Sequence, residues 1–520
     1  MYTTDNGLYI AHSSDGPISI VGKMANRHGL IAGATGTGKT VTLQVLAETF
    51  CQAGVPCFMA DMKGDLSGIS QTGSSSSFIE KRIAEFGMQP PQFQSCPVRF
   101  YDVFGEQGHP MRSTISQMGP DMLARLLNLN ETQSGILNIV FRIADDKKLL
   151  LIDMKDLRSM LDYVAKNAST FTTQYGNISS QSVGAIQRAL LALENQGGDK
   201  FFGEPAFDIS DLLATEGGKG VMSVLAADKL MMQPKLYSTF LLWLMSELYS
   251  TLPEVGDMPL PKLVFFFDEA HMLFDDTSKA MVDKIEQVVR LIRSKGVGIY
   301  FISQSPADIP DAILGQLGNR VQHALRAYTP KDKKTVKAAA ESFRENPAFK
   351  TEEAIQNLET GEALVSILDE KGAPTIVQRA KILFPLSQIG AVNATQREMI
   401  IRQSRIYGKY DKAYDRESAF EVLLAQAEKE QAEAEKAKAE AEKEKQKAKE
   451  EKEKAKEEKA KAKKSSSSTT GKIISTAATT AARTAAREIT KSIVGGSSKK
   501  KSSSSVLGSL VRGILGNLLK

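Results

Sequence analysis

The sequence predicts an α/β protein with a mainly parallel sheet, a helical insertion, and a charged helical or disordered C-terminal tail. Short apolar runs bounded by glycine or polar residues alternate with helical segments, a pattern typical of a parallel sheet covered on both faces. Between 110 and 215 the apolar spacing becomes helical, and from 426 to 464 the chain consists almost only of Ala, Glu, Lys and Gln. These breaks predict a core in two parts (1–109 and 216–425), the insertion (110–215), a Lys/Glu-rich helical spacer (426–464), a low-complexity linker (465–504) and an amphipathic helix (505–520).

Composition excludes several classes of protein. With 520 residues, of which 42% are hydrophobic, the chain can bury a large core. Its net charge of +5 is too small to indicate a nucleic-acid partner by itself. Three cysteines without a CxxC pair fit neither a disulfide framework nor a zinc knuckle. The first residues resemble no signal peptide and no uninterrupted apolar stretch reaches membrane length, so we expect a cytoplasmic protein without a membrane span.

The predicted tail consists of a spacer and an apolar end. Glu and Lys recur at helical spacing in 426–464, but apolar a and d positions are missing, which favours a solvated charged spacer over a stable coiled coil. The segment 505–520 places its leucines, with a valine and an isoleucine, on one helical face. This face needs a partner, which the sequence leaves open between another protein, a second copy of the chain and a membrane surface.

A glycine-rich segment, "GATGTGKT", has the pattern G-x-x-x-x-G-K-[ST] and lies between the strand-like "GLIA" and the helical "VTLQVLAETF". In that context glycines let backbone N–H groups surround phosphates, and the helix N-terminus adds positive potential. Lys39 would contact the β- and γ-phosphates, and the Thr40 hydroxyl would bind Mg²⁺. The alternative is a glycine-rich turn that binds no nucleotide. The predicted nucleotide-binding residues are Gly33, Ala34, Thr35, Gly36, Thr37, Gly38, Lys39 and Thr40.

Two acids end a later buried segment, "LVFFFDEAH". In a P-loop fold an acid at the end of a neighbouring strand holds Mg²⁺, and Asp268 has that place. Glu269 would then orient and deprotonate the attacking water, which favours hydrolysis over phosphoryl transfer. The alternative is that these residues only cap the strand. For His271 a structural or phosphate-sensing role is as well supported as a catalytic one.

Two further strands end in polar residues. Gln304 follows "GVGIYFIS" and would lie near the γ-phosphate as a sensor, unless it belongs to a turn-forming cluster before Pro306. Asp61 and Asp65 end "FMADMKGD". For Asp61, a place in the outer shell of the metal and a role in helix capping or turn formation both remain open.

These blocks resemble a known family. Segments 24–44, 55–68, 263–274 and 300–332 are similar to the HerA-like bacterial ATPases of the DUF853 (YjgR) group, in the HerA/FtsK superfamily of P-loop proteins. The resemblance covers about residues 7 to 415. It implies a RecA-like P-loop NTPase core, ATP and Mg²⁺ as cofactors, a hexameric ring with ATP between subunits, and double-stranded DNA as a partner.

The resemblance also assigns roles by position. Lys39, Glu269 and Gln304 would be catalytic, and Thr40 and Asp268 would bind the metal. Arginines from a neighbouring subunit stabilise the transition state in this superfamily, and Arg27 and Arg320 are the two candidates here. Each of them could instead form a surface ion pair. A helix-turn-helix, a zinc finger and a dense basic stripe are not recognisable in the globular part, so the DNA partner depends on the resemblance.

Two functions are therefore expected. The first is Mg²⁺-dependent ATP hydrolysis by a ring-forming HerA-like ATPase, coupled to DNA translocation or remodelling. The alternative is a nucleotide-gated scaffold that recruits a protein partner through its C-terminal tail. Stimulation of ATP turnover by duplex DNA discriminates the two.

Overall fold

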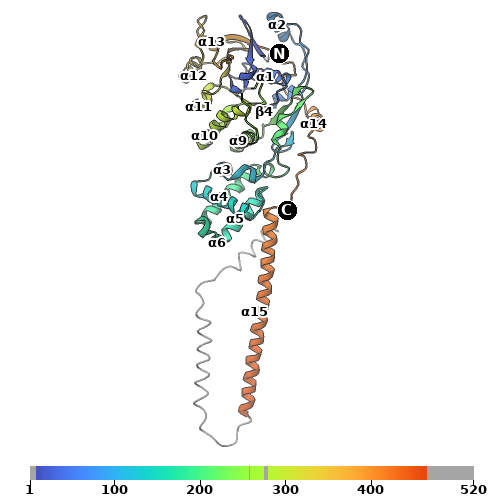
Figure 1. Cartoon of the computed structure of the whole chain (residues 1–520), viewed down its shortest axis with the longest axis vertical. Coiled ribbons are helices and arrows are strands. Elements are labelled where there is room, and N and C mark those ends of the chain that lie inside the picture. The colour runs from blue at the N-terminus through green and yellow to red at the C-terminus, as the bar shows by residue number, and fades with distance from the viewer. Residues whose placement is uncertain (1–6, 257, 275–278, 465–520) are drawn as a thin grey trace. The chain divides into compact units, whose positions relative to one another are not determined.

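A computed structural model describes residues 7–256, 258–274 and 279–464 (Figure 1). Residues from 7 to 420 belong to one compact unit, and the described residues from 421 onward belong to a second. The predicted linker 465–504 and amphipathic helix 505–520 lie outside the described residues.

The first unit is built on one large sheet. In the described part of the chain its strands follow the order β2-β1-β14-β13-β12-β3-β11-β10-β4-β9-β5-β6. All pairs from β12 to β6 are parallel, and the four strands on the other side pair antiparallel. The predicted α/β class with a mainly parallel sheet is thus confirmed. The strands are β1 (Gly7–Ser13), β2 (Gly16–Val21), β3 (Gly29–Ala32), β4 (Cys57–Asp61), β5 (Val98–Asp102), β6 (His109–Pro110), β9 (Met222–Ala226), β10 (Leu263–Phe267), β11 (Val297–Ser303), β12 (Asn319–Gln322), β13 (Glu362–Ser366) and β14 (Gln378–Ile382), and β7 (Thr215–Glu216) and β8 (Lys219–Gly220) pair separately.

Strand β10 shows why its sequence is apolar throughout. Successive side chains of a strand point to opposite faces. The Phe266 ring lies against Phe50 of helix α1 (Lys39–Gln52), with ring centroids 6.2 Å apart, while Phe267 lies next to Phe301 at 5.7 Å. Both faces are covered and every residue of β10 is buried, so alternation with polar residues is not needed.

Helices occupy most of the segment between β6 and β9, and Figure 1 shows α3 to α6 gathered together. Thr114, Asn130 and Asp153 begin three of these helices with reciprocal capping boxes, which explains where the helices start. The helices of this segment are α3 (Ile115–Leu126), α4 (Glu131–Asp146), α5 (Met154–Lys166), α6 (Ala168–Tyr175), α7 (Ser180–Glu194) and α8 (Gly198–Phe201).

The other helices cover the sheet or follow it. They are α2 (Ser77–Phe86), α9 (Pro234–Thr251), α10 (Lys279–Ile292), α11 (Asp311–Leu314), α12 (Pro330–Glu341), α13 (Thr351–Gln356), α14 (Ala394–Gln403) and α15 (Ala419–Lys464). Short 3-10 helices include η1 (Gly22–Arg27), η2 (Asp65–Ser70), η5 (Ala270–Leu273) and η7 (Pro306–Asp308). Helix α15 holds the Lys/Glu-rich segment and begins at Ala419, ahead of the expected 426. None of the helices described is long and apolar enough to span a membrane.

The buried carboxylate of Glu48 connects α1 by hydrogen bonds to the segment that follows β14. Glu48 accepts hydrogen bonds from the backbone N–H groups of Leu386 (2.7 Å) and Ser387 (3.0 Å) and from the Ser387 hydroxyl. Burial raises the pKa of the Glu48 carboxyl, against the effect of these hydrogen bonds.

Replacing Glu48 by Ala will lower the free energy of unfolding by about 3 kcal/mol, because buried donors lose a charged acceptor. Urea denaturation of the full-length chain measures this loss. Glu352→Ala, at an exposed position of α13, is the matched control and should leave the midpoint within error. A Glu48→Ala midpoint equal to that of the control would contradict the assignment.

Candidate active site

The strand order brings three sequence motifs to one edge of the sheet. Strand β11 lies between β3 and β10, and all three are parallel. Neighbouring strands are about 4.8 Å apart, so the ends of β3 and β10 are separated by roughly 10 Å. The carboxyl ends of these three strands are therefore neighbours. The glycine-rich loop follows β3, Gln304 follows β11, and the two acids follow β10.

The glycine-rich loop is held by backbone contacts to two strands. Gly33 N–H donates to the Ser303 carbonyl (3.2 Å), and Ala34 N–H donates to the Ala324 carbonyl (2.8 Å). Gly33 has a φ of 156°, and a Cβ there would lie 2.5 Å from the His323 Cβ, so no other residue fits. Gly38, with a φ of 114°, ends the loop and α1 begins at Lys39. The result is a strand-loop-helix whose helix N-terminus faces the loop.

Lys39 lies close enough to Asp268 and Glu269 for their negative charges to act on its ammonium. Its ammonium donates to the carbonyls of Gly33 (2.7 Å) and Ala34 (3.1 Å). Burial lowers the pKa of the Lys39 ammonium, and the negative charges of Glu269 and Asp268 act in the opposite direction. The structure thus brings the lysine of the loop together with the two acids of β10, although they are far apart in sequence.

Asp268 and Glu269 are both buried at the end of β10. Burial, followed by the negative charge of Glu269, raises the pKa of the Asp268 carboxyl to about 6. Glu269 N–H donates to the Asp268 carboxylate at 3.0 Å. Glu269 has the left-handed backbone angles φ 47° and ψ 49°, a conformation that costs a non-glycine residue of order 1–3 kcal/mol. Such strain is typical of functional sites.

Three side chains contact the Glu269 carboxylate. Lys63 donates to Oε1 at 2.7 Å, Gln304 donates to Oε2 at 3.3 Å, and His271 Nδ1 lies 3.5 Å from Oε2. Burial would raise the pKa of Glu269, but the hydrogen bond and positive charge of Lys63, together with the Gln304 hydrogen bond and the charge of His271, outweigh it, and the pKa is lowered. Gln304 and His271 are thus neighbours of the same acid.

Sequence reasoning missed Lys63. It lies in the loop after β4, and β4 is the strand beside β10. The predicted site residues of this loop are Asp61 and Asp65 only. The usable signal was that any polar residue at the end of a strand adjacent to β10 can reach Asp268 or Glu269.

The residues at this edge suit a divalent cation. Asp61 is 1% exposed, and its carboxylate accepts no hydrogen bond of normal geometry among the described residues, although the backbone N–H groups of Leu66 and Gly64 act to lower its pKa. Oδ1 of Asp65 is likewise buried without a hydrogen-bond partner among the described residues. Burial and the charge of Asp65 raise the pKa of Asp61 to about 7. Hard oxygen donors of this kind fit Mg²⁺. The part of the chain that is described holds no group of three metal-ligating acids, histidines or cysteines. A Mg²⁺ ion bound by Thr40 and Asp268 would therefore complete its shell with phosphate and water oxygens.

We expect Mg²⁺ binding to weaken as the pH falls through about 6, because the ion must displace the proton from Asp268. At pH 5 the deprotonated fraction is about a tenth, so the apparent affinity should fall about tenfold from its value at pH 7.5. Titration of Mg²⁺ in the presence of ADP at both pH values measures this ratio. Asp268→Asn should bind weakly at both, and equal affinity of the unmodified chain at both would contradict the assignment.

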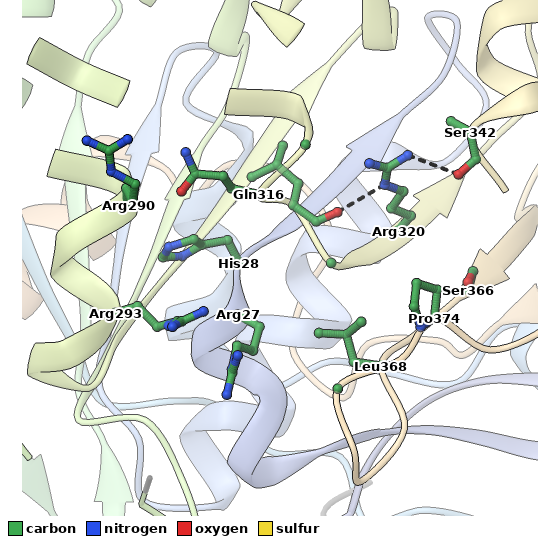
Figure 2. A pocket seen from close by; sticks show the side chains of 14 residues that line it. Arg27, His28, Arg290, Arg293, Gln316, Arg320, Ser342, Ser366, Leu368 and Pro374 are labelled. Atoms are coloured by element: carbon green, nitrogen blue, oxygen red, sulfur yellow. Dashed lines mark hydrogen bonds between the residues drawn. The ribbon is translucent and has the colours of Figure 1, made fainter. Parts of the chain in front are cut away.

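The two predicted trans-acting arginines line a pocket of about 440 Å³ at the opposite edge of the sheet (Figure 2). Arg27 precedes β3, and Arg320 lies in the first half of β12. Figure 2 shows Arg27, Arg290 and Arg293 around His28, with Arg320 on the other side. Sequence reasoning missed Arg290 and Arg293. The residues that line this pocket include no carboxylate.

Arg320 is fixed within its own chain. Its guanidinium donates to the carbonyls of Leu317 (3.0 Å), Leu314 (3.0 Å) and Ser342 (3.2 Å), two of which are drawn in Figure 2. Burial lowers the pKa of Arg320. Neither Arg27 nor Arg320 joins the glycine-rich loop of the same chain.

Comparison with known proteins places the chain in a family. The family described as "Helicase HerA-like C-terminal" matches residues 7–518. Two proteins described as "DNA double-strand break repair helicase HerA" are similar in sequence. That of Sulfolobus acidocaldarius is 31% identical over 121 residues, which cover 23% of each chain. That of Sulfurisphaera tokodaii is 22% identical over 359 residues, which cover 68% of this chain and 64% of the relative. The matches span less than two thirds of the length of these relatives.

Solved structures with a similar fold include TrwB and VirB4. The bacterial conjugative coupling protein TrwBdeltaN70 is 16% identical, with a TM-score of 0.46, and the match covers 74% of this chain and 91% of the solved chain. VirB4 of Thermoanaerobacter pseudethanolicus is 16% identical, with a TM-score of 0.44, and the match covers 72% and 96%. The family match over nearly the whole sequence confirms the resemblance seen in the motifs, and the chain belongs to the HerA-like P-loop ATPases.

Proposed function

We propose that this chain hydrolyses ATP in a Mg²⁺-dependent reaction, works as a ring, and couples hydrolysis to translocation on, or remodelling of, double-stranded DNA. The observation that carries the proposal is the meeting of Lys39, Asp268, Glu269 and Gln304 at one sheet edge. A single phosphate-bearing ligand placed on the loop would reach all four.

Each residue then has one task. The N–H groups of Gly33 to Thr40 and the Lys39 ammonium bind the phosphates. Thr40 and Asp268 hold Mg²⁺, which when bound supplies positive charge against the phosphate oxygens. Glu269 accepts the proton of the attacking water, and Gln304 positions Glu269 and the γ-phosphate. Because the base is a carboxylate beside the metal ligand, hydrolysis is favoured over transfer to another acceptor.

The arginine pocket supports assembly into a ring, which we propose to be a hexamer. Four arginines line it without a carboxylate among the lining residues, and it lies on the edge opposite the chain's own glycine-rich loop. A neighbouring copy could place its bound phosphates there, so that Arg27 or Arg320 stabilises the negative charge of the transition state. Arg320 uses three of its five N–H donors within its own chain, which leaves two for a neighbour.

Helix α12 supports the DNA part of the proposal. Its lysines Lys331, Lys333 and Lys334 are exposed, and Tyr328 ahead of the helix is 87% exposed. The helix packs against η7, which begins two residues after Gln304. A change at the γ-phosphate could therefore be transmitted to a basic surface. The relatives named as DNA repair helicases point to the same substrate.

We expect duplex DNA to raise ATP turnover several-fold, and Lys331→Ser/Lys333→Ser/Lys334→Ser to lose most of this rise. Phosphate contacts by lysines make binding salt-dependent, so the variant should also show a salt slope smaller by about 3. ATPase assays and DNA titrations at several salt concentrations measure both. Lys436→Ser/Lys438→Ser/Lys443→Ser in α15 removes the same charge elsewhere and is the control. Turnover of the unmodified chain that ignores duplex and single-stranded DNA would contradict the DNA coupling.

A nucleotide-gated scaffold is the second candidate. The 46-residue charged helix α15 favours it, because a helix without an apolar seam serves as a spacer toward a protein partner. Removal of 505–520 would then abolish partner binding, whereas ATP turnover would stay. We place either function in a reducing compartment such as the cytoplasm, since Cys51, Cys57 and Cys96 are free thiols.

A further inference from the structure

An exposed aromatic ring lies beside the glycine-rich loop. Phe78, the second residue of α2, is 47% exposed. A Cβ built on Gly361 would lie 3.8 Å from Phe78 Cζ, and the Gly361 N–H donates to the Thr37 carbonyl at 3.0 Å. A Cβ built on Gly38 would lie 3.3 Å from the Gly361 nitrogen. Phe78 and the loop thus border the same glycine.

A buried arginine orients the Phe78 ring. Arg82 is 5% exposed, and its guanidinium carbon lies 5.1 Å from the centroid of Phe78 and 5.7 Å from that of Phe86. A cation over an aromatic face is attracted to the ring. The same guanidinium donates from Nη2 to the Gly361 carbonyl at 3.3 Å. Arg82 therefore covers one face of Phe78 and connects the ring to the turn that contacts the loop.

The strand order indicates where a nucleoside would leave the loop. The γ-phosphate must lie on the side of β10, because β10 ends in the two acids. In the order β13-β12-β3-β11-β10 the loop follows β3, so the other end of a triphosphate leads toward β12 and β13. Strand β13 runs antiparallel to β12, and so begins at the edge where β3 ends. Gly361 directly precedes β13, which puts Phe78 on the nucleoside side.

We propose that the base of the bound nucleotide stacks on the exposed part of the Phe78 ring. An aromatic ring accepts any base, because every base has a π-face, so this contact adds affinity without selecting adenine over guanine. Phe78 would act on the base alone, whereas the loop and Lys39 act on the phosphates. The inference rests on the proposed binding of nucleotide by the loop 33–40, and is independent of DNA and of the ring of subunits.

Two ligands that share a diphosphate and differ in the nucleoside test the inference on the full-length protein. Phe78→Ala should weaken the binding of Mg-ADP about tenfold, as the loss of one base–aromatic stack does. The binding of magnesium pyrophosphate should stay unchanged, because the loop is not altered. Phe78→Tyr keeps the ring and should bind ADP like the unmodified chain. GDP should lose the same factor as ADP in Phe78→Ala. Isothermal titration calorimetry measures these affinities.

Fluorescence reports the stack directly. The chain has a single tryptophan, Trp243, which is fully buried, so Phe78→Trp adds one exposed indole. Stacking of a base on an indole quenches its fluorescence. ADP should therefore quench the emission added by Phe78→Trp, and pyrophosphate should not. Equal quenching by both ligands, or by neither, would contradict the stack.

The matched control removes another exposed aromatic side chain. Tyr414 is 57% exposed, and its backbone pairs with Glu204 of the helical insertion. Tyr414→Ala should change neither affinity. An ADP affinity of Phe78→Ala equal to that of the unmodified chain would overturn the stack, and so would a pyrophosphate affinity that falls by the same factor. If the unmodified chain bound neither ligand, the proposed nucleotide binding would itself be wrong, which separates the two failures.

Discussion

Replacing Glu269 by Gln will lower ATP turnover about 10²- to 10⁴-fold, while nucleotide still binds. Gln has the same shape but cannot accept the proton of the attacking water. The phosphates are held by the loop 33–40 and Lys39, none of which is changed, so affinity should stay. Steady-state ATPase assays and titration with a fluorescent ATP analogue measure the two quantities separately.

Two further variants serve as controls for this experiment. Lys39→Ala removes the ammonium that would contact the phosphates, so it should lose nucleotide binding together with turnover. Glu352→Gln in α13 removes an exposed acid and should change neither. If Glu269→Gln kept more than about a tenth of the turnover, the carboxylate would contribute less than a general base does, and the proposed mechanism would be wrong.

Much of this site could be predicted from the sequence because its signals are local. The glycine-rich loop is recognisable from eight consecutive residues between a strand and a helix, and Asp268 and Glu269 from the apolar run before them. The parallel sheet followed from apolar runs that lacked alternation, which the double-sided burial of β10 explains. These features depend on neighbours in the chain.

The missed features depend on neighbours in space. Lys63 meets Glu269 across 206 positions of sequence, only because β4 lies beside β10. Likewise, Arg290 and Arg293 join Arg27 because α10 ends next to the start of β3. The N-terminal hairpin β1–β2 pairs with β14, as Ala11 opposite Ile382 shows. No local pattern records which strands become neighbours, so the antiparallel edge was not predictable, and Lys63 could be found only by treating every polar residue at a strand end as a candidate.

The arginine pocket leads to the prediction with the largest expected effect. Arginines supplied by a neighbour contribute about 10³ to 10⁵ in kcat in related reactions, so Arg27→Ala or Arg320→Ala should lower turnover by that order. A loss alone does not identify the subunit that supplies the group. Arg320 in particular bonds three carbonyls of its own chain, and its removal could disturb β12 instead.

Mixing inactive variants resolves this point. Consider a ring assembled from equal parts of the Arg27→Ala and Lys39→Ala variants. Some interfaces then join an intact loop of one copy to an intact Arg27 of the next copy. With random assembly, about a quarter of all interfaces are complete in this way. Turnover should therefore return on mixing if Arg27 acts in trans, and the same test applies to Arg320. A mixture of Lys39→Ala and Glu269→Gln is the matched control. Because both residues lie in the same chain's site, no interface in that mixture is complete. If neither arginine variant regains turnover with Lys39→Ala while both fold and assemble, the pocket serves its own chain and the shared site between copies is excluded.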